Sequence, residues 1–338
     1  MPRVASDPSV LHINDVARIG THLCAQARRE GLDWSLVRLA RTDPRWRGWK
    51  KTLGRAWRGA AWEARLGRAA WGVDLINLHG GNIRRHTGWL PHPYVLHLHG
   101  SDVRTVRVES EAQRRVIDGA IERAREVYYT TPDLREPTCR LRPDALLQPV
   151  VVDVNELPTC SSGGVPTVVF PSRWDRAKGG DLQLEVARQL RRALGQHVRF
   201  EGLDWGEGAA LAARQAGVTL VPRMSHARYI EWLSRGTVAV GQVAGILSVS
   251  ELEVMGMDIP LVAPLNPRWY DGSHESLTDV PVGCGPVEAR HAVDAVVAAT
   301  RELLENPILP ARGWVEKIHG PRAAVSRLRG RYRAVMGG

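Results

Sequence analysis

Residues 167–190 read TVVFPSRWDRAKGGDLQLEVARQL, which combines a strand pattern, a polar loop and a helix pattern. The first four residues are apolar or β-branched, which is typical of a strand buried on both faces. Apolar residues recur at helical spacing after the two glycines, so we predict a helix at 181–194. The loop carries Arg173 and Lys178, a guanidinium fork and a point charge that can converge on one polyphosphate. Composition alone favours the other interpretation, an ordinary solvent-exposed basic loop.

The same alternation of strands and helices continues in both directions along the chain. Further strands are predicted at 10–13, 36–39, 73–78, 94–98, 127–130, 198–200, 218–221, 238–240 and 260–262. Further helices are predicted at 20–30, 109–124, 209–216 and 321–335. Buried strands that alternate with amphipathic helices indicate parallel sheets. The stretch 158–166 is rich in Gly, Ser and Pro, which indicates a linker.

We therefore predict an α/β fold of two Rossmann-like domains that face one another across a cleft. The first domain is expected at 1–157 and the second at 166–320. The terminal helix, 321–336, is expected to pack back on the first domain. Open parallel sheets bind ligands beyond the carboxyl ends of their strands, so we expect a nucleotide-like ligand at those ends.

Composition excludes several classes of protein. The chain has 338 residues, of which 43% are hydrophobic and 24% charged, and these values exclude a disordered or collagen-like chain. It contains no run of 18 apolar residues and no apolar core of a secretory signal at its start, so we expect a cytoplasmic protein. The four cysteines form no CxxC pair, which favours free thiols over disulfides or a zinc site.

Three stretches resemble motifs that occur together in one enzyme family. Residues 167–190 are similar to the pattern FxGRLxxxKGxDxLLEAxxxL, and residues 250–262 (SELEVMGMDIPLV) to LLEAMACGLPVV. Residues 96–102 (LHLHGSD) resemble an HGxD loop. These are motifs of nucleotide-sugar-dependent glycosyltransferases with the GT-B fold, in particular the retaining family 4 (glycosyl transferases group 1). The order of the motifs extends the resemblance from about Val10 to Tyr332.

The resemblance implies a retaining, metal-independent transfer of a sugar from a nucleotide-diphosphate donor of UDP or GDP type to a hydroxyl acceptor, without a resident cofactor. The acceptor classes that it suggests are a bacterial cell-surface glycan, a lipid-linked acceptor or a secondary metabolite. The implied catalytic residues are Arg173 and Lys178 at the diphosphate and His99 at the donor sugar. Glu253 is expected to hold the ribose. Other expected donor-side residues are Gly20, Ser248, Ser250 and Arg223, and the acceptor-side residues are His79 and Asp102.

The chain departs from the family pattern eight residues before Glu253. Gly245 stands where the family carries a glutamate that contacts the donor sugar, and Ser248 or Ser250 are candidates to replace it. A catalytically silent relative that binds nucleotide or carbohydrate is therefore one alternative, and a nucleotide-sugar epimerase of the same fold is another. We also expect His97 to point to the opposite strand face from His99 and to lie in the core.

Residues 41–71 form a basic, tryptophan-rich segment with nine Lys or Arg residues and two acids. On a helical projection the apolar face holds Trp49, Leu53, Trp57, Ala60, Ala64 and Trp71, and the basic residues that fall away from it include Lys51, Arg55, Arg58 and Arg65. This pattern favours a helix on an anionic membrane surface, here the inner face, through Arg55, Trp57 and Arg58. A helix docked on the core with a solvated basic face is the alternative, and binding of nucleic acid is a less favoured one.

Overall fold

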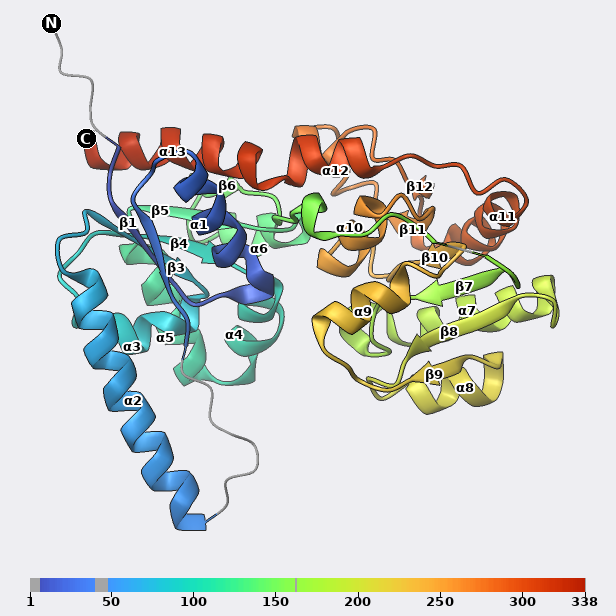
Figure 1. Cartoon of the computed structure of the whole chain (residues 1–338), viewed down its shortest axis with the longest axis horizontal. Coiled ribbons are helices and arrows are strands. Elements are labelled where there is room, and N and C mark those ends of the chain that lie inside the picture. Colours follow the sequence, from blue (N-terminus) through green and yellow to red (C-terminus); the bar gives the residue numbers. More distant parts are fainter. Residues whose placement is uncertain (1–6, 40–47, 162, 338) are drawn as a thin grey trace, which may run out of the picture. The chain divides into compact units, whose positions relative to one another are not determined.

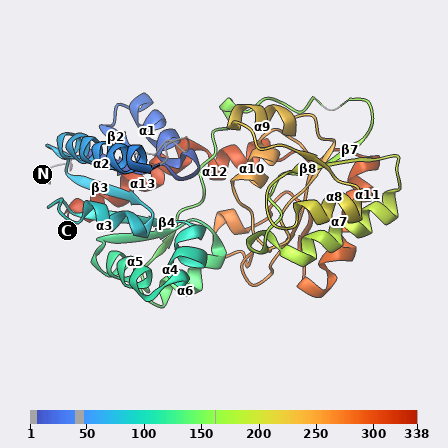
Figure 2. The same cartoon turned by 90° about the horizontal axis from the view of Figure 1, so that it is seen from below.

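The computed structural model describes residues 7–39, 48–161 and 163–337. The chain folds into two compact units. Unit 1 comprises Met1–Val151 and Pro321–Gly338, and unit 2 comprises Val152–Gly320. Figures 1 and 2 show the elements of each unit from two perpendicular directions.

Unit 1 is built on a six-stranded parallel sheet with the order β2-β1-β3-β4-β5-β6. Its strands are β1 (Val10–Ile13), β2 (Trp34–Val37), β3 (Leu75–His79), β4 (Tyr94–Leu98), β5 (Glu126–Tyr129) and β6 (Leu146–Leu147). Its α-helices are α1 (Ile19–Arg29), α2 (Gly48–Ala70), α3 (Arg84–Thr87), α4 (Arg107–Glu109), α5 (Glu111–Arg123), α6 (Arg135–Cys139) and α13 (Pro321–Gly337). Figure 1 shows α1 and α13 on one side of this sheet and α3, α4 and α5 on the other.

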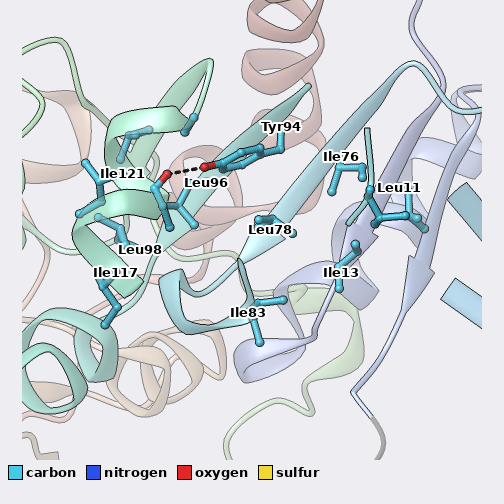
Figure 3. Close-up of a cluster of buried hydrophobic side chains, with 14 of the residues drawn as sticks. Leu11, Ile13, Ile76, Leu78, Ile83, Tyr94, Leu96, Leu98, Ile117 and Ile121 are labelled. Atoms are coloured by element: carbon cyan, nitrogen blue, oxygen red, sulfur yellow. Dashed lines mark hydrogen bonds between the residues drawn. The ribbon is translucent and has the colours of Figure 1, made fainter. Parts of the chain in front are cut away.

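Alternation along the strands divides the residues of this sheet between its two faces. Figure 3 shows one face, where Leu11, Ile76 and Leu96 pack with Ile117 and Ile121 of α5. The Tyr94 hydroxyl donates a hydrogen bond to the carbonyl of Ala120, at 2.7 Å, and so fixes α5 to β4. The opposite face meets α1 and α13, which pack against each other, and a row of polar side chains lies there.

Unit 2 also contains a six-stranded parallel sheet, with the order β12-β11-β10-β7-β8-β9. Its strands are β7 (Thr167–Phe170), β8 (Arg199–Leu203), β9 (Thr219–Val221), β10 (Val238–Val240), β11 (Leu261–Leu265) and β12 (Gly283–Pro286). Its α-helices are α7 (Gly180–Leu194), α8 (Ala209–Ala216), α9 (His226–Leu233), α10 (Val249–Gly256), α11 (Ala292–Glu305) and α12 (Arg312–His319). Apolar side chains of α7, α8 and α11 pack on the buried residues Val168, Phe170 and Val240.

The predicted α/β class with two parallel sheets is confirmed. The strand predicted at 36–39 begins two residues earlier, and the short strands β6 and β12 were missed because neither contains an apolar run of strand length. The described part of the predicted linker 158–166 runs along unit 2, where the Cys160 amide donates to the Met257 carbonyl at 3.0 Å. The four cysteines are free thiols, as expected. No helix of the described residues is both long and apolar enough to cross a bilayer.

Candidate functional site

The strand order of unit 2 reverses between β7 and β10, because β8 and β9 extend the sheet to one side and β11 and β12 extend it to the other. At such a point the loops after the two strands diverge and leave room for a ligand. The loop after β7 carries Lys178, and the loop after β10 carries Gln242 and Val243. The two loops are joined here, since the Val243 amide donates to the Lys178 carbonyl at 3.1 Å.

Lys178 is anchored to the first turn of α10, which follows the loop after β10. Its ammonium donates a hydrogen bond to the Ser248 hydroxyl at 3.1 Å. Ser248 is the N-cap of α10 and forms a capping box with Glu251, whose carboxylate turns back to the Ser248 amide at 3.0 Å. The Ser172 hydroxyl also donates to Glu251, at 2.6 Å. The structure thus brings together Lys178, Ser248 and Ser250, three of the residues that the sequence predicts for the donor side.

The Glu251 side chain is fully buried, yet it is held in its charged form. Burial opposes ionisation, but the Lys178 charge and the hydrogen bonds from Ser172 and Ser248 outweigh it and keep the pKa of Glu251 below its usual value. Sequence reasoning missed this residue and gave a role to only one glutamate of α10, Glu253. The signal was present, because Ser248 followed three residues later by a glutamate is the sequence signature of a capping box.

Arg173 lies on the same loop as Lys178 but has different partners. Its guanidinium pairs with the carboxylate of Asp175, at 2.6 Å, and stands 5.5 Å from the ring centre of Trp205. Arg223, at the end of β9, lies over the same ring at 4.2 Å. The two arginines therefore share one partly exposed tryptophan. Trp205 had no role in the sequence prediction, and no local pattern marks it.

Glu253 projects from the second turn of α10 and is already paired. One of its carboxylate oxygens lies 2.6 Å from the Nε2 atom of His226, the first residue of α9. An open pocket of about 670 Å³ lies at the start of this helix, lined by Pro222, Arg223, Met224, Ser225 and Arg228. Glu253 thus stands close to a pocket with two arginines, and His226 sets the orientation of its carboxylate.

Gly179 allows the Lys178 loop to pass close to the loop after β10. Its φ is 120°, and an added Cβ would lie 2.2 Å from the Cγ2 atom of Val243. We expect Gly179→Ala to lower the free energy of unfolding by at least about 2 kcal/mol, because it adds backbone strain to a steric clash. Denaturant unfolding measures this change. Gly195→Ala is the matched control, since Gly195 has a φ of 64° and open space around it. Equal losses in the two variants would contradict the close approach.

In unit 1 the strand order reverses between β1 and β3. The Asn14 side chain, which follows β1, donates to the carbonyl of His79, the last residue of β3, at 2.7 Å. Gly20 lies in the first turn of α1, where an added Cβ would meet the Leu36 side chain at 3.0 Å. Gly20 therefore serves the packing of α1 on β2.

Asp102 joins the loops after β3 and β4. Its carboxylate accepts hydrogen bonds from the backbone amides of His99, at 2.9 Å, and Gly81. Burial raises the pKa of Asp102 to about 6, although these two hydrogen bonds act in the opposite direction. Asp102 therefore holds the backbone on which His99 stands.

A row of histidines crosses the face of the unit 1 sheet that meets α13. His12 Nδ1 lies 3.1 Å from His79 Nε2, and the Asn77 amide nitrogen contacts both His12 Nδ1, at 3.3 Å, and the Tyr332 hydroxyl, at 2.5 Å. The His79 ring stacks on His99, with 5.8 Å between ring centres.

The prediction that His97 points away from His99 is wrong. His97 is buried as expected, but its ring lies 5.0 Å from the same His79 ring that contacts His99. Residues two apart in a strand share a face, so both imidazoles lie on one side of the sheet. Burial lowers the pKa of His12, His79 and His99 to about 3, and His99 is therefore a neutral group at physiological pH.

Helix α2 docks on the sheet through a stripe other than the apolar face that the sequence predicts for the membrane surface. The buried residues are Trp62, Leu66 and Ala70, and the Trp62 indole donates to the Arg38 carbonyl at 2.9 Å. Trp57 is 76% exposed, so the predicted apolar face points to solvent. Arg58 is half-buried. The side chains of Trp49, Lys51 and Arg55 lie outside the described residues.

No family model matches the chain, and no curated protein matches it by sequence. Solved structures match almost its whole length. A sucrose-phosphate synthase from Thermosynechococcus elongatus is 15% identical, with a TM-score of 0.65 over 97% of this chain and 99% of the other. HepE from Anabaena, in complex with UDP and glucose, is 13% identical, with a TM-score of 0.67 over 97% and 100%. A glycosyltransferase from Rickettsia africae is 11% identical, with a TM-score of 0.61 over 98% and 99%.

At these identities the similarity shows the fold. The chain has the α/β fold of the GT-B glycosyltransferases, with two Rossmann-like domains, as its motifs predict.

Proposed function

We propose that this protein is a glycosyltransferase that moves a sugar from a nucleotide-diphosphate sugar to a hydroxyl acceptor. The observation that carries the proposal is the position of Lys178, which is anchored to Ser248 at the point where the strand order of unit 2 reverses. A cation, a helix N-terminus and a close backbone approach coincide there, and such a combination favours a phosphate group. Similar solved structures of the same fold contain UDP or UDP-glucose, which supports a nucleotide-sugar donor.

In the proposed reaction the bond between the anomeric carbon and the diphosphate oxygen breaks. A bond to the acceptor oxygen forms on the same face of the sugar, and the acceptor proton passes to the leaving diphosphate. Lys178 and the amides of α10 would stabilise the negative charge that develops on the diphosphate, and Arg173 would join them by leaving Asp175. His99 would hold the donor sugar as a neutral hydrogen-bonding group, and Glu253 would accept hydrogen bonds from the ribose. No step in this scheme requires a metal or a resident cofactor.

A thermal-shift screen against UDP, GDP, ADP, TDP and CDP tests the donor site. We expect one of them to raise the melting temperature, since a ligand that binds only the folded state stabilises it. The matching nucleotide sugar is then incubated with the protein alone. Slow release of nucleoside diphosphate supports a transferase, and conversion of the donor to an isomeric sugar supports the epimerase alternative. Binding without any turnover, with or without hydroxyl acceptors, supports a catalytically silent relative.

We further propose that α2 binds an anionic membrane surface and so brings the enzyme to a lipid-linked acceptor. Figure 1 shows the first half of α2 extending away from the unit 1 sheet. Leu53 and Trp57 are 61% and 76% exposed on this half, in a segment with nine basic residues and two acids. Exposed indole and aliphatic groups next to a basic face are the features of an interfacial helix.

The combined variant with Arg55, Trp57 and Arg58 replaced by alanine should bind vesicles of phosphatidylglycerol and phosphatidylcholine at least about 30-fold more weakly. Each arginine near an anionic surface contributes about 1 kcal/mol, and loss of the indole adds to this. Vesicle sedimentation measures the change. Ile308→Ala is the control, because Ile308 is 72% exposed and lies in unit 2. Unchanged binding of the triple variant, or equal binding to uncharged vesicles, would contradict the membrane role of α2.

A further inference from the structure

We propose that Glu251 is a positioning residue, which orients the Lys178 ammonium through the Ser248 hydroxyl. The inference rests on the proposed diphosphate site and adds a residue to it.

The carboxylate of Glu251 is completely surrounded by donors. One oxygen accepts hydrogen bonds from the Ser172 hydroxyl, at 2.6 Å, and from the Gln242 amide, at 3.2 Å. The other accepts from the amide and hydroxyl of Ser248 and from the Gln242 side chain, at 3.2 Å. The Ser250 hydroxyl lies 3.2 Å from the same oxygen. The Glu251 side chain is fully buried, so its negative charge acts on the neighbouring groups with little screening by water.

A carboxylate accepts hydrogen bonds and donates none, so it determines where the neighbouring protons point. The hydroxyl protons of Ser172 and Ser248 are directed to Glu251. The Ser248 oxygen is then free to accept, and Lys178 donates to it at 3.1 Å. A chain of donors therefore runs from Lys178 through Ser248 to Glu251.

The direction of these hydrogen bonds also determines which ligand groups can form hydrogen bonds with the serine hydroxyls. Phosphate oxygens are acceptors, and a hydroxyl whose proton is committed to Glu251 offers them nothing. Sugar hydroxyls are donors as well, and the lone pairs of the half-buried Ser248 suit them. We infer that Lys178 and backbone amides bind the diphosphate, and that the Ser248 oxygen faces a sugar hydroxyl.

A double-mutant cycle separates this role from the capping of α10. Wild type, Glu251→Gln, Lys178→Ala and the double variant are titrated with UDP and with GDP by calorimetry. Glutamine has the same size but also donates, so it disturbs the serine protons. We expect Glu251→Gln to weaken binding about 5- to 10-fold in the presence of Lys178. In the Lys178→Ala background the same substitution should change binding by less than about twofold.

Ser110→Ala provides the matched control. Ser110 caps α5 in unit 1, where its hydroxyl accepts from the Gln113 amide at 3.2 Å. Its loss should lower stability without changing nucleotide affinity. If Glu251→Gln does not fold, Ser248→Ala enters the cycle in its place, since it interrupts the same donor chain.

The experiment distinguishes a failure of the proposed diphosphate site from a failure of the proposed role of Glu251. Equal weakening by Glu251→Gln with and without Lys178 would show that Glu251 only supports the helix, and the proposed diphosphate site would stand. Failure of the wild type to bind UDP, GDP or any other nucleoside diphosphate of the thermal-shift screen would contradict the diphosphate site itself, and the role of Glu251 with it. Weakening that depends on Lys178 supports both.

Discussion

Lys178→Ala should bind its nucleoside diphosphate about 10- to 100-fold more weakly than the wild type. The variant loses a charge-assisted hydrogen bond to phosphate, which contributes about 1.5–3 kcal/mol. The rate of sugar transfer should fall further, by at least about 100-fold, since the same ammonium faces charge that grows in the transition state. Calorimetry and a donor-consumption assay measure the two effects separately.

Lys317→Ala is the matched control for this experiment. Lys317 is exposed on α12, in the same unit as Lys178. The Lys317→Ala substitution removes the same charge and leaves the loops after β7 and β10 unchanged. If the two variants bind nucleoside diphosphate equally well, the Lys178 loop is an ordinary basic loop and the donor site lies elsewhere.

The second large effect is a loss of stability in acid. Burial lowers the pKa of His12, His79 and His99 to about 3, while in the unfolded chain each titrates near its usual value of 6.5. Between these values the unfolded state binds more protons than the folded state. Stability is therefore fully present above about pH 6.5 and falls as the pH is lowered toward 3.

Each unit of pKa difference between the folded and unfolded states changes the free energy of unfolding by about 1.4 kcal/mol. Each of the three histidines therefore contributes several kcal/mol to the loss of stability in acid. Asp102 acts in the opposite direction, because burial raises its pKa from 3.8 to about 6 and the folded state gains a proton first. The stability gained in acid from this one carboxyl group is smaller than the stability lost at the three histidines. We expect unfolding between about pH 4 and 5, since typical domains are stable by about 5–15 kcal/mol.

Melting temperatures at pH 7, 6, 5 and 4 test this expectation, and His97→Phe is the informative variant. Neither ring nitrogen of His97 has a hydrogen-bond partner among the described residues, and burial lowers the pKa of His97 well below 6.5. Phenylalanine preserves the ring and does not titrate. The variant should be at least as stable as the wild type at pH 7 and lose less stability in acid. A melting temperature that stays constant from pH 7 to pH 4 would contradict the buried neutral histidines.

The local elements could be predicted because their signals lie within short windows. Strand β7, the polar loop and helix α7 follow one another within 28 residues, and each has its own periodicity. The capping box of α10 is equally local, but the sequence prediction did not include it or Glu251. The stripe through which α2 docks on the sheet was not predicted, because a helix with tryptophans on several faces does not reveal which of them meets a sheet.

The sequence by itself determined the two α/β units, the basic loop at Lys178 and the histidines at the strand ends, since these depend on residue type and spacing. Only the tertiary structure decided that β7 and β10 are neighbours, and hence that Lys178 meets Ser248 and Glu251 some 70 residues away. It also decided that His12, His79, His97 and His99 share one buried face. The buried histidines are neutral and the buried Glu251 is charged because of their surroundings in the fold. Desolvation and hydrogen bonding depend on neighbours in space rather than along the chain.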